Sequence, residues 1–406
     1  MTGPENEKTA QAAPEEGRFS RALREIASGS ALMSFLAIVM ALIIGGILIA
    51  VTDDRVIEAS RYFFGRPGDM LAAVWDSVSG AYIALFQGAV YDFRRDDFGS
   101  AIRSLTQTFV FATPLIAAGL GVALAFRVGL FNIGGRGQIL IGAGFAGYAS
   151  FAWDLPPVLH VIVALLMGIL GGALWGGIAG FLKARTGAHE VIVTIMLNYI
   201  AYYLISWALS TQGLLQAPGT TNPKSPAADA DAVLPSLFGP PYAVHWGLIL
   251  VIAATVLAWW LIERSSLGFQ FRAVGLNPHA ARNAGMKVER IYLYAMLIAG
   301  GYAGLAASTE VLGTTTSGFT DGVDAGIGFD AITVALLGRS RPWGVFAAGL
   351  LFGAFKTGGF TMQASQGIST DIVLVVQSMI VLFIAAPPLV RAIFRLPAPT
   401  RKAVAA

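Results

Sequence analysis

Ten apolar stretches dominate the chain, and each is long enough to cross or nearly cross a lipid bilayer. They fall at 31–51, 105–126, 137–153, 160–182, 190–210, 245–262, 291–312, 323–338, 343–360 and 371–387. Hydrophobic residues make up 55% of the chain and charged residues 13%, a ratio that a soluble domain of this length would not tolerate. We therefore expect an all-α, polytopic membrane protein with about ten transmembrane helices. The eighth stretch is the weakest and is a candidate for a broken or re-entrant helix.

The distribution of Lys and Arg predicts the orientation of the chain in the membrane. If the N-terminus is cytoplasmic, 19 of the 27 Lys and Arg residues fall in cytoplasmic regions, and six of the others lie in the long 52–104 segment beside eight acids. Short cytoplasmic loops carry an excess of basic residues, whereas long segments count weakly. This pattern predicts that both termini are cytoplasmic. The net charge of +3 is spread over several loops, so no nucleic-acid partner is expected.

The predicted organisation is a transmembrane domain at 31–390 between two cytoplasmic tails, 1–30 and 391–406. The first tail lacks the short apolar core of a signal peptide. The outer segment 52–104 is too polar to span the membrane, but its apolar residues recur at helical spacing and predict an amphipathic helix on the outer surface. The outer segment 211–244 is rich in Pro, Ala, Gly and Asp, which predicts an irregular, exposed loop.

Several sequence patterns argue against a catalytic, metal-binding or nucleotide-binding site on this chain. There is no cysteine, and the four histidines are scattered, so neither a metal site nor a catalytic triad is predicted. Residues 142–147 match a dinucleotide-binding glycine pattern, but they lie inside an apolar stretch with no preceding strand. Residues 353–357 miss the phosphate-binding loop pattern. We expect no enzyme activity, no metal and no cofactor bound by the chain itself.

Glycines recur every four residues in the fourth apolar stretch, at Gly168, Gly172, Gly176 and Gly180. A spacing of four places them on one side of a helix, where small residues let two backbones approach closely. The stripe predicts a tight contact between two helices.

The longest and most basic inner loop, 263–290, contains the start and stop positions of a short helix. Asn277 is a typical N-cap, Pro278 a typical first helical residue, and Gly285 a typical left-handed C-terminal cap. These positions predict a helix over 278–284 with small side chains. Such a helix can dock into a groove on another protein, and the alternative is a simple connector.

Four segments of the chain resemble one known family. RAVGLNPHAARNAGM at 272–286, with the Gly-rich stretch after it, resembles the coupling loop of permease subunits in bacterial ATP-binding-cassette (ABC) importers of the ribose-type, inner-membrane-translocator family. FNIGGRGQ at 131–138 resembles FNIGAEGQ, and EVIVTIMLNYIA at 190–201 resembles EVISTLMLNYIA, both typical of the nucleoside-importing branch. Residues 331–344 match the late AVALLG-x-x-x-P-x-G run. The chain departs at Gly135-Arg136, where Ala-Glu is usual.

The resemblance implies a membrane-spanning permease subunit that carries a nucleoside across the bacterial inner membrane. Its implied partners are a cytoplasmic ABC ATPase that binds the ATP, a second related permease, which would make a homo- or heteromeric pair, and an extracytoplasmic substrate-binding protein, besides membrane lipid. A simple sugar such as ribose or galactose is the alternative cargo, and branched-chain amino acids come third. The competing class is an ion-coupled secondary transporter, against which the scarcity of acids within the spans argues.

Polar groups within spans are expected to face the bundle interior, a partner side chain or a water-filled path. The candidate pathway residues are Asn132, Gln138, Thr194, Asn198, Tyr199 and Asp330. For each of them the alternative is hydrogen bonding between helices. Lys356 is expected to snorkel or to pair with an acid. The candidate ATPase-coupling residues are Arg272, Gly275, Asn277, Pro278, Ala281, Arg282 and Gly285, and we expect Ala281 at the docking face.

Overall fold

A computed structural model describes residues 30–395 of the chain. All the named elements within these residues are helices, which confirms the predicted all-α class. The predicted tails lie almost entirely outside the described residues. Only Ser30 of the first tail and residues 391–395 of the second lie inside them.

Each of the ten predicted apolar stretches coincides with one helix. The helices are α2 (Ser30–Thr52), α3 (Asp54–Ser60), α4 (Pro67–Ala89), α5 (Phe98–Ala101), α6 (Arg103–Arg127), α7 (Gly135–Ala152), α8 (Pro157–Thr186), α9 (Glu190–Leu209), α10 (Gly247–Arg264), α11 (Ser266–Leu276), α12 (Pro278–Asn283), α13 (Val288–Thr309), α14 (Ile327–Leu337), α15 (Pro342–Gln366), α16 (Thr370–Ala385) and α17 (Pro387–Phe394). A 3₁₀ turn, η1 (Ala230–Ala232), and a π-helical turn, η2 (Glu310–Thr314), complete the described elements.

Seven helices in the described part of the chain are long and apolar enough to cross a membrane, and α16 with α17 makes an eighth candidate that bends by 95°. The predicted number of about ten is therefore not confirmed. The eighth predicted stretch contains only the short helix α14, whose 11 residues rise about 17 Å, roughly half a bilayer core. The helix α7 carries Arg136 and Gln138 and packs against α8, α9, α13 and α14, so most of its residues are buried in protein, although Phe145 and Tyr148 are exposed.

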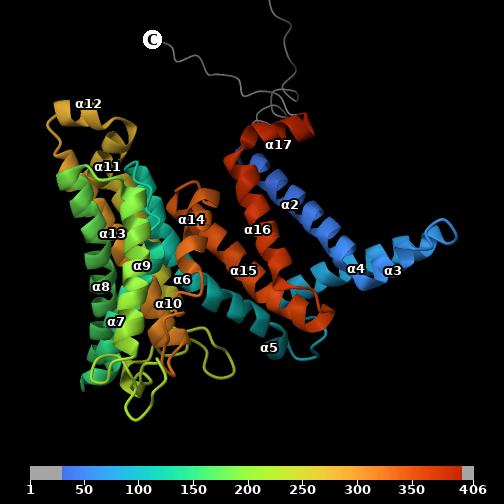
Figure 1. Ribbon diagram of the computed structural model, residues 1–406, viewed down its shortest axis with the longest axis horizontal. Coiled ribbons are helices and arrows are strands. Elements are labelled where there is room, and N and C mark those ends of the chain that lie inside the picture. Colours follow the sequence, from blue (N-terminus) through green and yellow to red (C-terminus); the bar gives the residue numbers. More distant parts are fainter. Residues whose placement is uncertain (1–29, 396–406) are drawn as a thin grey trace, which may run out of the picture.

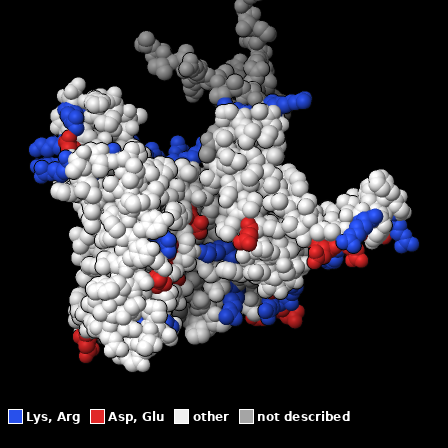
Figure 2. Space-filling view, in the orientation of Figure 1, with Lys and Arg blue, Asp and Glu red and all other residues white. Residues whose placement is uncertain are grey.

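The helices form two groups that meet along α6, α14 and α15 (Figure 1). One group contains α7 to α11 and α13, and the other contains α2, α4 and α16. The helix α12 lies at the same end of the molecule as α17 and the start of α2, whereas residues 210–246 lie at the opposite end. Lys and Arg side chains are visible on α12 and beside α17 at the first end (Figure 2).

The closest helix contact joins α8 to α13, and it confirms the predicted role of the glycine stripe. A Cβ at Gly172 would overlap the carbonyl oxygen of Gly300, and a Cβ at Gly300 would overlap that of Gly172. One turn away, a Cβ at Gly304 would overlap the carbonyl oxygen of Gly168. The two backbones therefore touch directly, and no side chain other than hydrogen fits between them.

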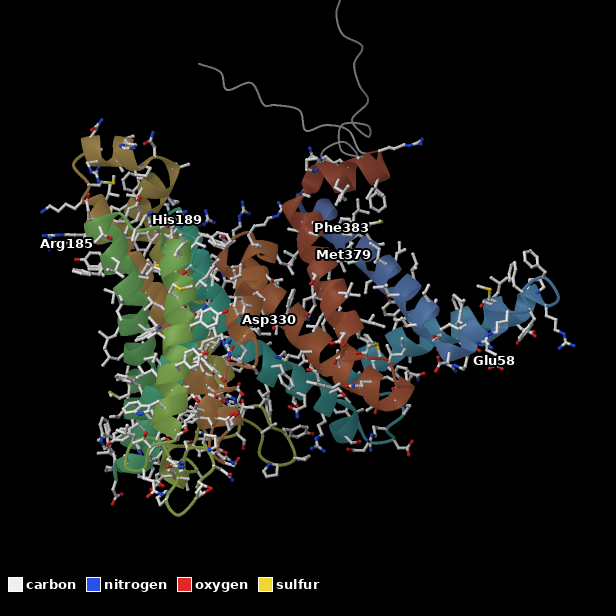
Figure 3. The ribbon with its side chains drawn as sticks, in the orientation of Figure 1. Glu58, Arg185, His189, Asp330, Met379 and Phe383 are labelled. Atoms are coloured by element: carbon white, nitrogen blue, oxygen red, sulfur yellow. The ribbon has the colours of Figure 1, made fainter. Side chains whose placement is uncertain are left out.

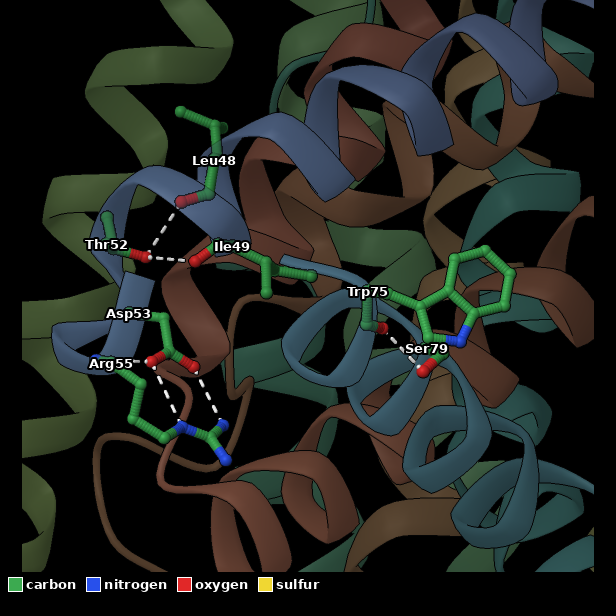
Figure 4. A network of polar contacts seen from close by, with 7 residues as sticks. All are labelled: Leu48, Ile49, Thr52, Asp53, Arg55, Trp75 and Ser79. Atoms are coloured by element: carbon green, nitrogen blue, oxygen red, sulfur yellow. Dashed lines mark hydrogen bonds and ion pairs between the residues drawn. The ribbon is translucent and has the colours of Figure 1, made fainter. Parts of the chain in front are cut away.

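The predicted amphipathic helix of the 52–104 segment is present as α4, which packs against α15. Its small residues are buried, with Ala81, Ala84 and Gly88 against α15, whereas Leu71 and Trp75 are exposed. At the corner between α2 and α3, Asp53 accepts hydrogen bonds from the backbone N–H of Arg55 (2.8 Å) and from its guanidinium (2.9 Å), as Figure 4 shows. The hydrogen bond from the Arg55 side chain holds the pKa of Asp53 far below its usual range.

The predicted exposed loop 211–244 is irregular but is not free in solvent, which corrects the sequence interpretation. Backbone N–H groups of Ser225, Ala228 and Leu234 donate to carbonyls of Phe319 (3.0 Å), Thr316 (2.9 Å) and Leu312 (2.7 Å). The side chains of Leu215, Ser225 and Leu234 are buried. The loop and the 312–319 segment thus pack together as one layer that covers the end of the bundle.

His245, the residue directly after this loop, is expected to make the stability of the protein depend on pH. Its imidazole is buried, Nδ1 accepts from the N–H of Gly247 (3.1 Å), and burial lowers its pKa from 6.5 to about 4. Because the unfolded chain binds the proton more readily, the stability contributed by neutral His245 is complete above pH 6.5 and is lost as the pH falls towards 4. The loss reaches up to about 3 kcal/mol.

Thermal unfolding of the purified protein between pH 7 and 4 measures this effect. We expect His245→Asn, whose Oδ1 replaces the Nδ1 acceptor but does not titrate, to unfold with a shallower dependence on pH over this range. Equal slopes for the variant and the parent protein would show that His245 does not contribute.

Candidate functional site

Three of the predicted pathway residues form one buried amide cluster at the start of α7. Asn132 and Gln138 exchange two side-chain hydrogen bonds of 3.2 Å, and Asn132 Oδ1 also accepts from the N–H of Gly134 (2.9 Å). Asn198 on α9 accepts from the N–H of Gly137 (2.8 Å) and donates to the carbonyl of Ile133 (3.0 Å). The cluster fixes the extended segment before α7 against α9.

The other two α9 candidates lie differently. The Thr194 hydroxyl is buried and donates to the carbonyl of Glu190 (2.8 Å) within its own helix, while Tyr199 is 57% exposed. At the start of α9, Glu190 forms an ion pair of 2.8 Å with Lys183 at the end of α8. The structure therefore brings Asn132, Gln138 and Asn198 together and leaves Tyr199 on the outside of the chain.

The unusual Arg136 is neutralised by an acid distant in the sequence. Its Nε lies 3.3 Å from Oδ1 of Asp324, and its guanidinium stacks over the ring of Tyr202, 5.2 Å from the ring centre. Asp324 is nearly buried, with its side chain 6% exposed. The positive charge that replaces the usual acid at this position thus has a partner, and the pair links α7 to the segment that leads into α14.

Removal of the Arg136 side chain is expected to lower the stability of the protein by a measurable amount. In Arg136→Ala the nearly buried Asp324 carboxylate loses its cation, and we expect destabilisation by about 1–3 kcal/mol. The double variant Arg136→Ala/Asp324→Ala should recover part of that loss, because no unpaired charge remains. Melting temperatures of the parent, the two single variants and the double variant measure the coupling, and strictly additive effects would mean that the two side chains do not interact.

Asp330 lines a cavity of about 330 Å³ between α6, α14, α15 and α16. Figure 3 labels Asp330 at mid-height, between the two groups of helices. Lys356 also lines the cavity and donates to the carbonyl of Ala325 (3.1 Å) while it lies over the ring of Phe111, and Gln377 adds an amide. The remaining lining is mostly apolar and includes the rings of Phe352, Phe355 and Phe360.

Sequence reasoning placed Asp330 among the pathway candidates but left out Lys356, Gln377 and the phenylalanines. Lys356 was visible as the one Lys or Arg inside an apolar stretch. A charged residue at such a position usually faces the bundle interior or a cavity, and is therefore a candidate for a functional residue. The phenylalanines are ordinary core residues by pattern, so only the packing of α14 against α15 and α16 separates them from the rest of the core.

The predicted coupling helix is present as α12, one residue shorter than predicted. Asn277 Oδ1 caps it by accepting from the N–H groups of His279 (3.0 Å) and Ala280 (3.1 Å), and Gly285 has a φ of 85°. Arg282 is exposed and pairs with Glu289. One expectation fails, because Ala281 is only 4% exposed and faces the protein, so it does not lie on a docking face. The large apolar side chains exposed in this loop are Leu276, at 88%, and Phe269, at 58%.

The 263–290 loop is anchored to the bundle at two points. The Arg272 guanidinium donates to the carbonyl of Ile262 at the end of α10. The backbone of Gly275 packs on the end of α6 so closely that a Cβ would overlap the carbonyl oxygen of Arg127. Arg127 in turn donates from Nε to the carbonyl of Ser340 (2.9 Å), between α14 and α15. The loop therefore packs on the end of α6, and Arg127 links that end to the turn between α14 and α15, the helices that carry Asp330 and Lys356.

These features define a class, a polytopic helical membrane protein with a mostly apolar cavity that contains a few polar side chains inside the bundle, and a short helix exposed at one end. The model of the family described as "Branched-chain amino acid transport system / permease component" matches residues 104–385. The chain belongs to this family of permeases, which confirms the resemblance predicted from the four sequence segments. No solved structure was found to match the chain.

Three relatives illustrate the range of the family. The guanosine ABC transporter permease protein NupP of Bacillus subtilis is 39% identical over 315 residues, covering 78% of this chain and 88% of NupP. The nucleoside ABC transporter permease protein NupB of Lactococcus lactis is 34% identical over 353 residues, covering 83% and 94%. The glucose ABC transporter permease protein TsgB13 of Haloferax volcanii is 36% identical over 290 residues, covering 69% and 75%.

Proposed function

We propose that this chain is the membrane-spanning subunit of an ATP-driven importer for nucleosides. The observation that carries the proposal is the likeness to NupP and NupB over more than three quarters of the chain. The nucleoside-type segments at 131–138 and 190–201 support it, since they supply the amide cluster of Asn132, Gln138 and Asn198. The chain itself binds no ATP in this proposal.

The proposed assembly contains a cytoplasmic ABC ATPase, a second related permease and an extracytoplasmic substrate-binding protein in the bacterial inner membrane. All the relatives named above are ABC transporter permeases, which favours this assembly over an ion-coupled transporter. The placement of α12 and the start of α2 at one end of the molecule agrees with a cytoplasmic N-terminus and a cytoplasmic coupling loop.

The cavity at Asp330 and Lys356 is the proposed place where the cargo passes through this subunit. A nucleoside presents a planar base and several hydrogen-bonding groups. The phenylalanine rings can stack on a base, while Asp330, Lys356 and Gln377 offer donors and acceptors. Its volume, about 330 Å³, lies within the range of small-molecule sites. The amide cluster supports the pathway in this proposal by fixing the start of α7 against α9.

Movement reaches this cavity by direct contact in the proposed mechanism. Closure of the ATPase pushes α12, and Gly275 transmits the push to the end of α6. Arg127 passes it to Ser340 between α14 and α15. A shift of those two helices changes the distance between Asp330 and Lys356, and thereby opens or closes the cavity.

A simple sugar is the second candidate cargo, because TsgB13 is named as a glucose permease. Uptake of labelled nucleosides and labelled sugars by cells that lack the gene separates the two. We expect cells without the gene to lose nucleoside accumulation and keep ribose, galactose and glucose accumulation, and the plasmid-borne gene should restore the lost uptake. Loss of sugar uptake alone would show that the cargo is a sugar and not a nucleoside.

The proposed orientation has its own test. Since the chain has no cysteine, an introduced cysteine is labelled without background. Ser225 is a poor position because it is buried, whereas Thr221 is exposed in the same loop. We expect Thr221→Cys to react with a membrane-impermeant thiol reagent in intact cells and Asn283→Cys, on α12, to react only after the cells are opened. The opposite labelling pattern would show that the 211–244 loop is cytoplasmic and that α12 lies outside.

A further inference from the structure

A groove of about 970 Å³ lies where α6 and α10 end and α15 begins. Its lining is basic and aromatic and consists of Arg127, Trp259, Glu263, Arg264, Arg341, Pro342, Trp343 and Gly344. Three arginines face one acid, so the groove carries an excess of two positive charges. It lies at the end of the molecule that carries the coupling loop, because α11 follows α10 directly and Gly275 packs on Arg127.

We infer that this groove binds the phosphate of an anionic phospholipid headgroup. The three arginines belong to three different segments and line the same groove, which suits a single compact anion better than an extended acidic chain. The groove also contains the first turn of α15. The N–H groups of Trp343 and Gly344 lie in that turn, where the helix itself supplies no acceptor and the helix dipole favours a negative charge.

Two of the three arginines are held in place by contacts within the protein. Arg127 uses Nε to bind the carbonyl of Ser340 (2.9 Å), which leaves its terminal nitrogens for the groove. Arg264 stacks on Trp259, 5.6 Å from the ring centre. A stacked or anchored guanidinium loses less freedom when it binds an anion, so less affinity is lost in ordering the site.

The aromatic residues favour a lipid over a soluble phosphate. Indole rings prefer the depth of the headgroups, and Trp259 and Trp343 stand at the ends of spanning helices. One turn along α15, Phe346 contacts Trp343 with ring centres 6.0 Å apart. The apolar surface therefore continues from the groove along a spanning helix, in the direction that an acyl chain would take. Inorganic phosphate offers the same headgroup chemistry but gains nothing from this surface.

Binding of fluorescent phosphatidylglycerol to the full-length permease in zwitterionic detergent tests the inference. We expect Arg264→Gln/Arg341→Gln to bind at least about tenfold more weakly, because each guanidinium near a headgroup contributes on the order of a threefold to fivefold factor. Glu263→Gln should bind more tightly, since it removes the one acid in the groove. Arg185→Gln is the matched control, because Arg185 also stacks on an aromatic ring, that of Phe181, near the same end of the bundle.

Several outcomes would overturn the inference. Equal binding by the double variant and the parent would place the lipid elsewhere, and equal binding of phosphatidylcholine would show that the headgroup charge is not recognised. Displacement of the lipid by inorganic phosphate at comparable concentration would make the ligand a free phosphate. If the double variant binds the lipid normally but no longer retains the ATPase, the groove is a protein contact.

Discussion

The variant Gly300→Ala is expected to assemble poorly, although it adds only one methyl group. That methyl would overlap the carbonyl oxygen of Gly172 on α8, so α8 and α13 would have to separate. Overpacking of a rigid contact costs about 1–3 kcal/mol and more where backbone must move, and here the obstacle is backbone. We expect a large loss of folded protein and a clearly lower melting temperature, measured by size-exclusion chromatography and thermal unfolding in detergent.

The neighbouring residue supplies the control. A Cβ at Gly301 would meet Ile169 and Ala173 at 3.6 and 3.8 Å, which is ordinary contact. Gly301→Ala should therefore be neutral or slightly stabilising, because alanine favours the helix by roughly 0.5–1 kcal/mol over glycine. If both variants behave alike, the close approach of α8 and α13 is not a constraint on this protein.

The second large effect is expected at Leu276, which lies directly before the cap of α12 and is 88% exposed. If α12 docks into the ATPase, this side chain is buried in the complex, and a charge there costs about 2 kcal/mol or more. Leu276→Glu should reduce substrate-stimulated ATP hydrolysis by roughly thirtyfold, while the isolated permease keeps its melting temperature. Hydrolysis by the purified complex with loaded binding protein is the measurement.

Two matched variants separate docking from folding. Leu276→Met keeps an apolar contact and should retain most of the activity. Ala281→Glu, by contrast, places a charge at a buried position and should destabilise the permease itself. Normal hydrolysis by Leu276→Glu would mean that the ATPase contacts the permease elsewhere and that the 263–290 loop is a connector.

Local patterns in the sequence were sufficient to predict much of the fold. The apolar stretches, the glycine stripe of α8 and the caps of α12 each depend on residues within a few positions of one another, so spacing reveals them. The short α14 was also visible as the weakest stretch. What spacing could not show is which side of a two-turn helix faces the protein, and Ala281 was misplaced for that reason.

Contacts between residues that are far apart along the chain could not be predicted from the sequence. Arg136 meets Asp324, and the loop that contains Ser225 meets Phe319, across large separations along the chain that no periodicity records. The cavity was found only in part for the same reason. Asp330 and Lys356 are conspicuous as charged residues in apolar stretches, but most of their neighbours from α6, α15 and α16 look like ordinary core positions.

The central claim is that this permease moves nucleosides with energy from a separate ATPase. Uptake of a labelled nucleoside into proteoliposomes, with the permease pair, the ATPase and the binding protein reconstituted, tests it most directly. We predict accumulation only when ATP is present on the ATPase side, loss of that accumulation with Leu276→Glu, and no effect of ionophores that collapse ion gradients. Uptake driven by an ion gradient without ATP, or ATP-driven uptake of sugars but of no nucleoside, would contradict the claim.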